Sequence, residues 1–93
     1  MNKLERIAAI LRGVQACEIM GADYYPATAG RIARQANLPR VSVYRAMSRL
    51  VALGLVDYRR YSAETGSLIG HFNAYYLTIK GQEFLDNQKE LPL

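Results

Sequence analysis

The chain has 93 residues, a formal net charge of +4 and 51% hydrophobic residues, enough for one small domain with a single core. No apolar run reaches the roughly 18 to 20 residues of a membrane span, and acids and bases are mixed in residues 1–13, which argues against a secretory signal. We therefore expect a cytoplasmic protein. One cysteine, Cys17, cannot form an internal disulfide, and with a single histidine, His71, it cannot complete a four-ligand zinc site. We expect no metal and no cofactor.

The basic residues are unevenly distributed along the sequence. No Asp or Glu occurs between Tyr24 and Val56, and Arg59 and Arg60 follow soon after this acid-free stretch. Arginines clustered without carboxylates repel one another in the folded state, which favours a polyanion as partner, although a solvated basic face is the simpler interpretation. The arginines within the stretch are Arg31, Arg34, Arg40, Arg45 and Arg49.

Residues 3–22 are predicted to form the first helix, because their apolar residues recur at three- and four-residue spacing. The apolar face is broad, and Cys17 within it is expected to be a small core residue. This breadth predicts burial on two sides, against the rest of the domain and against a second copy of the helix. The candidate dimer-interface residues are Leu4, Ile7, Leu11 and Val14. Tyr24 and Tyr25, beyond the helix, are compatible with a very short strand.

The next two helices are predicted at 28–36 and 39–53. Thr28 is a suitable N-cap for the first of them, whose Arg31 and Arg34 are expected to face outward. Asn37 and Leu38 form the turn, and proline at position 39 is well tolerated in the first turn of a helix. In the 39–53 helix the inward face is predicted to hold Val43, Ala46, Met47 and Leu50, and the outward face Val41, Tyr44, Arg45 and Ser48.

Gly54 is expected to end this helix in a left-handed cap, with Leu55 placed to contact Leu50. The sequence then becomes rich in aromatic and branched residues over 55–61 and 71–78, which predicts two strands of a hairpin. Residues 62–70 contain glycines and polar groups, so they are expected to form a long loop. Thr78 can cap a final helix over 79–88.

The segment from Thr28 to Val56, "TAGRIARQANLPRVSVYRAMSRLVALGLV", resembles the helix-turn-helix core of winged-helix DNA-binding proteins, and "YYLTIKGQEFL" resembles the passage from wing to final helix in small bacterial, archaeal and phage regulators. MarR-like and PadR-like repressors share these features. The resemblance covers residues 28–85. It implies a single winged-helix domain over 1–93 of α+β, mostly helical class, with a β-hairpin wing at 55–78. It also implies a nucleoid-associated repressor of transcription. The small size of the chain and the broad apolar face of residues 3–22 predict that it acts as a homodimer.

A helix in the major groove needs outward side chains that reach base edges and flanking cations that meet phosphates. We expect Arg45 to contact guanine, with Tyr44 and Ser48 beside it and Val41 against a thymine methyl. The alternative is that these arginines are ordinary exposed helix residues, surrounded by solvent and without a binding role. The expected phosphate contacts are Thr28, Arg31, Arg34, Arg40, Arg49, Arg59 and Arg60.

Two other functions are compatible with the same residues. A winged-helix adaptor that binds protein in a phage or plasmid assembly would use the tyrosines of the wing, since tyrosine is common in interfaces. Binding of structured RNA or single strands would use stacked aromatic residues. Monomeric DNA binding is a further alternative to the dimer. Catalysis is not expected, because the acid-free region contains no paired carboxylates and Cys17 is expected to be buried.

Overall fold

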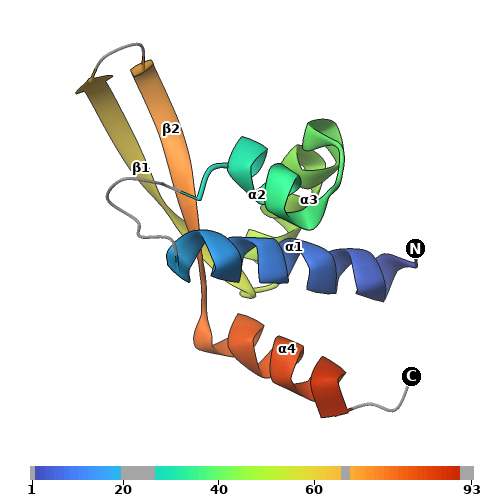
Figure 1. Cartoon of the computed structure of the whole chain (residues 1–93). Helices are drawn as coiled ribbons and strands as arrows, with labels where there is room; N and C mark the ends of the chain where they lie inside the picture. The colour runs from blue at the N-terminus through green and yellow to red at the C-terminus, as the bar shows by residue number, and fades with distance from the viewer. Residues whose placement is uncertain (1, 20–26, 66–67, 91–93) are drawn as a thin grey trace.

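The computed structural model describes residues 2–19, 27–65 and 68–90. Helix α1 crosses the middle of the molecule, with α2 and α3 on one side of it, α4 on the other, and a long hairpin projecting away (Figure 1). This is the mostly helical α+β winged helix that the sequence predicts. None of the described helices is long and apolar enough to cross a membrane. The elements are α1 (Lys3–Ile19), α2 (Ala29–Ala36), α3 (Arg40–Ala52), β1 (Val56–Thr65), β2 (Leu68–Leu77) and α4 (Ile79–Glu90).

Helix α1 is the centre of the core. Ile10, Leu11, Val14 and Cys17 are all 0% exposed, and the helix contacts α2, β2 and α4. The broad apolar face is therefore used within the domain. The prediction that Leu11 and Val14 form a dimer interface is wrong for this reason, since neither has surface to offer a second copy. Residues 20–22 of the predicted helix and the predicted short strand at 24–25 lie outside the described residues.

The α2–α3 turn follows local rules of helix capping. The Thr28 side chain accepts a hydrogen bond from the Arg31 amide at 3.4 Å, which confirms Thr28 as the N-cap of α2. Asn37 ends the helix in the left-handed region at φ 54°, a conformation that asparagine tolerates better than most residues. Pro39 is itself the N-cap of α3, so this helix begins one residue later than predicted.

The end of α3 is a Schellman motif. Gly54 has φ +76°, its amide donates to the Val51 carbonyl at 3.0 Å, and the Leu55 amide donates to the Leu50 carbonyl at 3.0 Å. These are the 5→2 and 6→1 hydrogen bonds that define the motif. Leu50 and Leu55 are both buried in the same core cluster. The predicted left-handed cap is confirmed, and it turns the chain directly into the first strand of the wing.

The two strands of the hairpin are longer than the sequence predicted. Its antiparallel register runs from Val56 opposite Leu77 to Thr65 opposite Leu68, with residues 62–65 paired to 68–71. The predicted loop at 62–70 is therefore wrong, because seven of its nine positions are strand. Polar residues and glycines have low strand propensity, but cross-strand pairing continues through them and overrides that preference.

The base of the hairpin is fastened to three helices. The Tyr75 amide donates to the Ala27 carbonyl at 3.0 Å, just before α2. The Leu77 amide donates to Glu18 Oε1 of α1 at 2.9 Å. Thr78 then caps α4, accepting from the Gly81 amide at 3.0 Å. These contacts fix the direction in which the wing leaves the helical core.

Candidate nucleic-acid interface

The outward side of α3 carries the predicted base-contacting residues. Val41 is 60% and Tyr44 62% exposed, and Arg45 and Ser48 are also exposed. We call these four residues the recognition face. The opposite side of the helix is buried through Val43, Met47 and Leu50. The predicted amphipathic pattern of α3 therefore holds, since all four predicted residues lie together at the surface.

The N-terminal half of the recognition face forms a shallow depression of about 300 Å³, lined by Arg40, Val41, Tyr44 and Arg45. Exposed branched and aromatic side chains between arginines combine apolar contact with positive charge. Such a surface suits a partner that offers both apolar groups and anions. The edges of DNA bases, with their methyl groups and acceptors, beside phosphates are one such partner.

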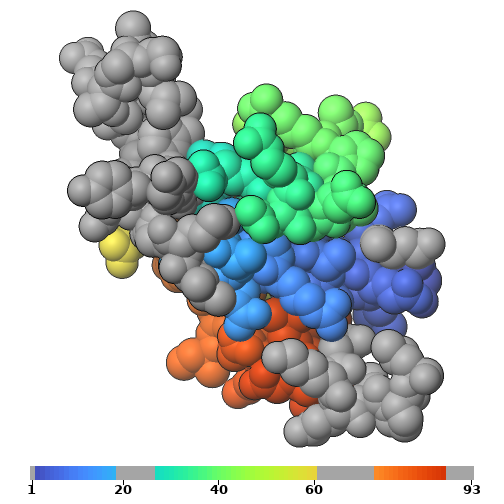
Figure 2. Space-filling view, in the orientation of Figure 1, coloured from blue at the N-terminus to red at the C-terminus, as the bar shows by residue number. Residues whose placement is uncertain are grey.

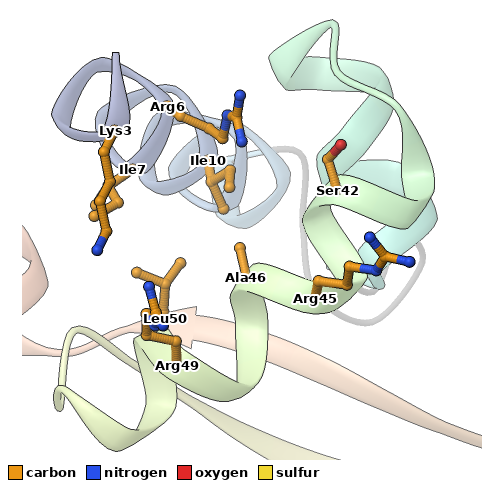
Figure 3. A pocket seen from close by; sticks show the side chains of 9 residues that line it. All are labelled: Lys3, Arg6, Ile7, Ile10, Ser42, Arg45, Ala46, Arg49 and Leu50. Atoms are coloured by element: carbon orange, nitrogen blue, oxygen red, sulfur yellow. The ribbon is translucent and has the colours of Figure 1, made fainter. Parts of the chain in front are cut away.

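Arg40 and Arg49 lie on different flanks of α3. A Cβ placed at Gly30 of α2 would lie 3.6 Å from Arg40 Nε, so Arg40 lies against α2. Arg49 instead lines a groove between α1 and α3, about 640 Å³ in volume (Figure 3). We call this the α1–α3 groove. It is lined by Lys3, Arg6, Ile7, Ile10, Ser42, Arg45, Ala46, Arg49 and Leu50.

The α2 residues predicted to contact phosphate behave differently from one another. Arg34 is exposed. Arg31 is half-buried and its Nε is enclosed, so the prediction that Arg31 faces outward is wrong. Burial raises the pKa of the Cys17 thiol, and the charge and hydrogen bonding of Arg31 partly oppose that rise. Arg31 therefore lies near Cys17 of α1, whereas Arg34 is exposed at the surface.

The wing presents its arginines near its base. Arg59 and Arg60 are both exposed and stand opposite Ala74 and Asn73 in the register. The guanidinium carbon of Arg59 lies 6.0 Å from the ring centroid of Tyr76, a distance at which the ring face attracts a cation. The described side chains of the wing therefore include two cations directed to solvent, in the region predicted to contact a backbone.

The arginines of α3 are not neutralised by any side chain in the described part of the chain. Among the side chains that the structure describes, residues 2–18, 27–60 and 73–87, none of them makes an ion pair. No group of His, Cys, Asp or Glu in the same part of the chain could hold a metal ion. The site thus consists of exposed positive charge and apolar side chains, a composition suited to binding a polyanion.

Lys3 and Arg6 were not predicted as part of the site. Sequence reasoning treated the first helix as core and dimer contact only. Its signal was nevertheless present, because Lys3 precedes Ile7 by four residues and Arg6 precedes Ile10 by four, which places each cation on the same side of α1 as its isoleucine. Figure 2 shows the start of α1 and the green segment of α3 on the same side of the molecule.

Solved structures with this fold include two whose descriptions concern transcription or DNA. A MarR family transcription regulator is 21% identical, with a TM-score of 0.66 over 91% of this chain and 48% of that one. This chain thus spans about half the length of that regulator. A protein of Ralstonia eutropha JMP134, described provisionally as DNA-binding, is 25% identical, with a TM-score of 0.61 over 90% of this chain and 94% of that one.

Comparison with curated protein sequences gave no match. Comparison with protein families gave a match over residues 22–76, which contain α2, α3 and most of the wing. The matching family is described as the sugar-specific transcriptional regulator TrmB. Because the match includes more than half of the chain, and the fold agrees with that of the two solved structures above, the chain belongs to the family of the transcriptional regulator TrmB.

Proposed function

We propose that this domain binds double-stranded DNA in a sequence-specific manner and acts in transcriptional regulation. Helix α3 enters the major groove and the hairpin wing lies on the adjacent backbone. The observation that carries the proposal is the recognition face: an exposed, acid-free helix surface in which Arg45 stands beside uncovered Val41 and Tyr44. A major groove supplies acceptors, methyl groups and flanking phosphates for such a surface.

Within this proposal the recognition face supplies sequence preference. Arg45 makes a bidentate contact with guanine O6 and N7, worth about 1–3 kcal/mol of discrimination. Tyr44 and Ser48 contact neighbouring edges, and Val41 packs on a thymine methyl. These roles agree with the exposure of the four side chains and with the burial of the opposite side of α3.

The flanking cations supply affinity without sequence preference. Arg40, Arg49 and Arg34 are exposed around α3 and α2, where they meet phosphates on either side of the groove. Arg59 and Arg60 extend the contact along the wing. Thr28 and Arg31 contribute less than expected from sequence, because the Thr28 hydroxyl caps α2 and Arg31 is half-buried.

The functional unit is proposed to be a two-fold dimer that represses transcription. Leu4 is 55% exposed and Ile7 is half-buried, so the N-terminal turns of α1 offer the apolar surface for a second copy. A symmetric dimer requires an inverted-repeat site whose half-sites are separated by about 10–10.5 base pairs, or a multiple of that spacing.

Selection from a random duplex library with the purified protein tests this proposal directly. Enrichment of one motif is the expected result, and an inverted repeat would also establish the symmetry. The affinity for the selected duplex is then measured against salt, where binding through several phosphates gives a log-log slope of about −0.9 per phosphate. Failure to enrich any duplex at low salt would contradict the proposal.

A protein-binding adaptor is the second candidate, because Tyr58 is 44% and Tyr76 36% exposed on the wing. Tyrosines of this kind are common in protein interfaces. The same salt titration separates the two functions. A tyrosine-mediated protein contact changes little between low and moderate salt, whereas duplex binding weakens steeply.

A further inference from the structure

We propose that the α1–α3 groove is part of the DNA interface, and that Lys3 and Arg6 hold the phosphate backbone on the side of α3 that faces away from α2. This inference rests on the proposed function and adds a contact to it. It assigns helix α1 a role in binding as well as in the core.

The groove gathers basic side chains from two helices. Lys3 and Arg6 come from the first turns of α1, and Arg45 and Arg49 come from α3, where Arg45 lies at the rim with its side chain directed away from α1 (Figure 3). No acidic residue is among those that line it. Four positive charges around one hollow repel one another, so an anion that enters it is attracted by all of them.

Within the described side chains no ion pair neutralises Lys3 or Arg6. Glu5 is the acidic residue of the first turn of α1, but its Oε1 accepts a hydrogen bond from Asn2 Nδ2 at 2.8 Å. Asn2 Oδ1 in turn accepts from the Glu5 amide at 2.8 Å, a reciprocal cap of the helix start. Neither Lys3 nor Arg6 makes an ion pair with any side chain that the structure describes.

The position of the groove identifies the anion. Arg45 lines both the α1–α3 groove and the depression on the recognition face, so the two surfaces are continuous. A helix in the major groove is flanked by both backbones, and Arg40 on the α2 side meets only one of them. The other backbone passes the Arg49 side of α3, where Lys3 and Arg6 stand across the hollow.

The spacing also suits a phosphate backbone. Lys3 and Arg6 are three residues apart, a rise of about 4.5 Å along α1. Phosphates on one DNA strand recur about every 3.4 Å of the duplex axis, so one strand offers anions to both side chains as it passes. Ala46, an apolar residue that lines the groove on the α3 side, packs against the sugar edges between them.

The test compares the double variant Lys3→Ala/Arg6→Ala with wild type on the selected duplex, by fluorescence anisotropy over a salt series. Loss of two phosphate contacts is expected to make the log-log slope shallower by roughly 1.8 and to weaken binding roughly 10- to 100-fold at 0.1 M salt, with the two lines converging toward 1 M. Cations near the N-terminus of a helix interact unfavourably with the helix dipole, so their removal should not prevent the variant from folding. Lys3→Gln/Arg6→Gln provides a second pair of neutral substitutions.

The control is Arg12→Ala/Lys80→Ala, which removes the same charge from exposed positions outside the groove. Arg12 is nine residues from Lys3, so it lies on the opposite side of α1. The inference is overturned if both double variants change the slope equally, because net charge alone then explains the effect. It is also overturned if the groove variant loses self-association while its slope is unchanged, which would identify a second copy as the occupant. Absence of duplex binding by the wild-type protein would instead overturn the proposed function itself.

Discussion

Arg40 and Arg49 stand on opposite sides of α3, one against Gly30 of α2 and the other in the α1–α3 groove. Nine residues separate them, which is two and a half turns of helix at 3.6 residues per turn, or about 13 Å along the axis. A helix with a cation on each flank and an exposed apolar and polar face between them can meet both edges of a DNA groove at once.

Because these two arginines are far apart and share no partner, their contributions should add. Arg40→Ala and Arg49→Ala are each expected to make the salt slope shallower by roughly 0.9, and the double variant by roughly the sum. Anisotropy titrations of the three variants on one duplex measure this. A double variant no weaker than either single variant would mean that the two arginines meet the same phosphate.

Substitutions of Arg45 and of Arg34 should affect DNA binding in different ways. Arg45→Ala is expected to relax the preference at one base position by about 1–3 kcal/mol and leave other positions unchanged. Arg34→Ala, on the exposed surface of α2, should weaken all duplexes alike and reduce the salt slope by about 1. Competition among single-base variants of the selected duplex distinguishes the two. Equal and uniform losses would show that Arg45 contacts phosphate and reads no base.

Substitutions of buried and of exposed leucines in α1 should have separate effects, the first on the stability of the monomer and the second on dimerisation. Leu11 is 0% exposed, so Leu11→Ala is expected to lower the free energy of unfolding by about 2–5 kcal/mol, as measured by urea denaturation. Leu4 is 55% exposed, so Leu4→Ala should change the stability of the monomer by less than about 0.5 kcal/mol while weakening the dimer in sedimentation experiments. A dimer that is unaffected by Leu4→Ala would exclude this surface of α1.

Cys17 gives the stability a pH dependence of known sign. Burial raises the pKa of its thiol in the folded protein, whereas unfolding exposes the thiol and restores its ordinary pKa of about 8.5. The folded state therefore holds the proton more tightly. The resulting stabilisation is complete below the unfolded pKa and is lost as the pH rises through the higher folded value.

Urea denaturation between pH 7 and pH 10 tests this dependence. The free energy of unfolding of wild type should fall more steeply above about pH 8.5 than that of Cys17→Ala, in which this titration is absent. The comparison uses the slopes with pH, so the cavity left by alanine does not obscure it. Parallel curves for the two proteins would show that the thiol titrates alike in the folded and unfolded states.

The parts of the fold that follow from neighbouring residues were predictable. The Thr28 cap, the Gly54 turn and the two faces of α3 each depend on residues within a few positions of one another. The length of the wing strands was not predictable in this way, because the pairing of residues 62–65 with 68–71 depends on both strands together. Local propensity is a weak guide where cross-strand contacts decide the conformation.

The site was predictable in its centre and not at its edges. The acid-free α3 face could be recognised from a helical wheel, but a wheel does not show which helix stands opposite. The broad apolar stripe of α1 predicts contact with a second copy, whereas α2, β2 and α4 cover it within the domain. For the same reason a helical wheel does not bring Lys3 and Arg6 to α3, because only the tertiary packing of α1 beside α3 forms the groove that they line.

Gly81, in the first turn of α4, should not tolerate a side chain. A Cβ at this position would clash with the Leu55 carbonyl oxygen. The backbone there is held by the Schellman turn and by the Thr78 amide, which donates to the same carbonyl at 3.3 Å. Gly81→Ala is therefore expected to separate α4 from the start of the wing and to lower the free energy of unfolding by at least about 1–3 kcal/mol.

Gly30→Ala is the matched control for Gly81→Ala. Its Cβ would meet Arg40 Nε at 3.6 Å, an ordinary contact at the end of a long side chain, and alanine in a helix is favoured over glycine by roughly 0.5–1 kcal/mol. Gly30→Ala should thus be neutral or stabilising in thermal and urea denaturation, while Gly81→Ala unfolds more easily. Equal stabilities for the two variants would mean that α4 can move away from the turn at little cost, in which case the wing is oriented mainly by its contacts with Ala27 and Glu18.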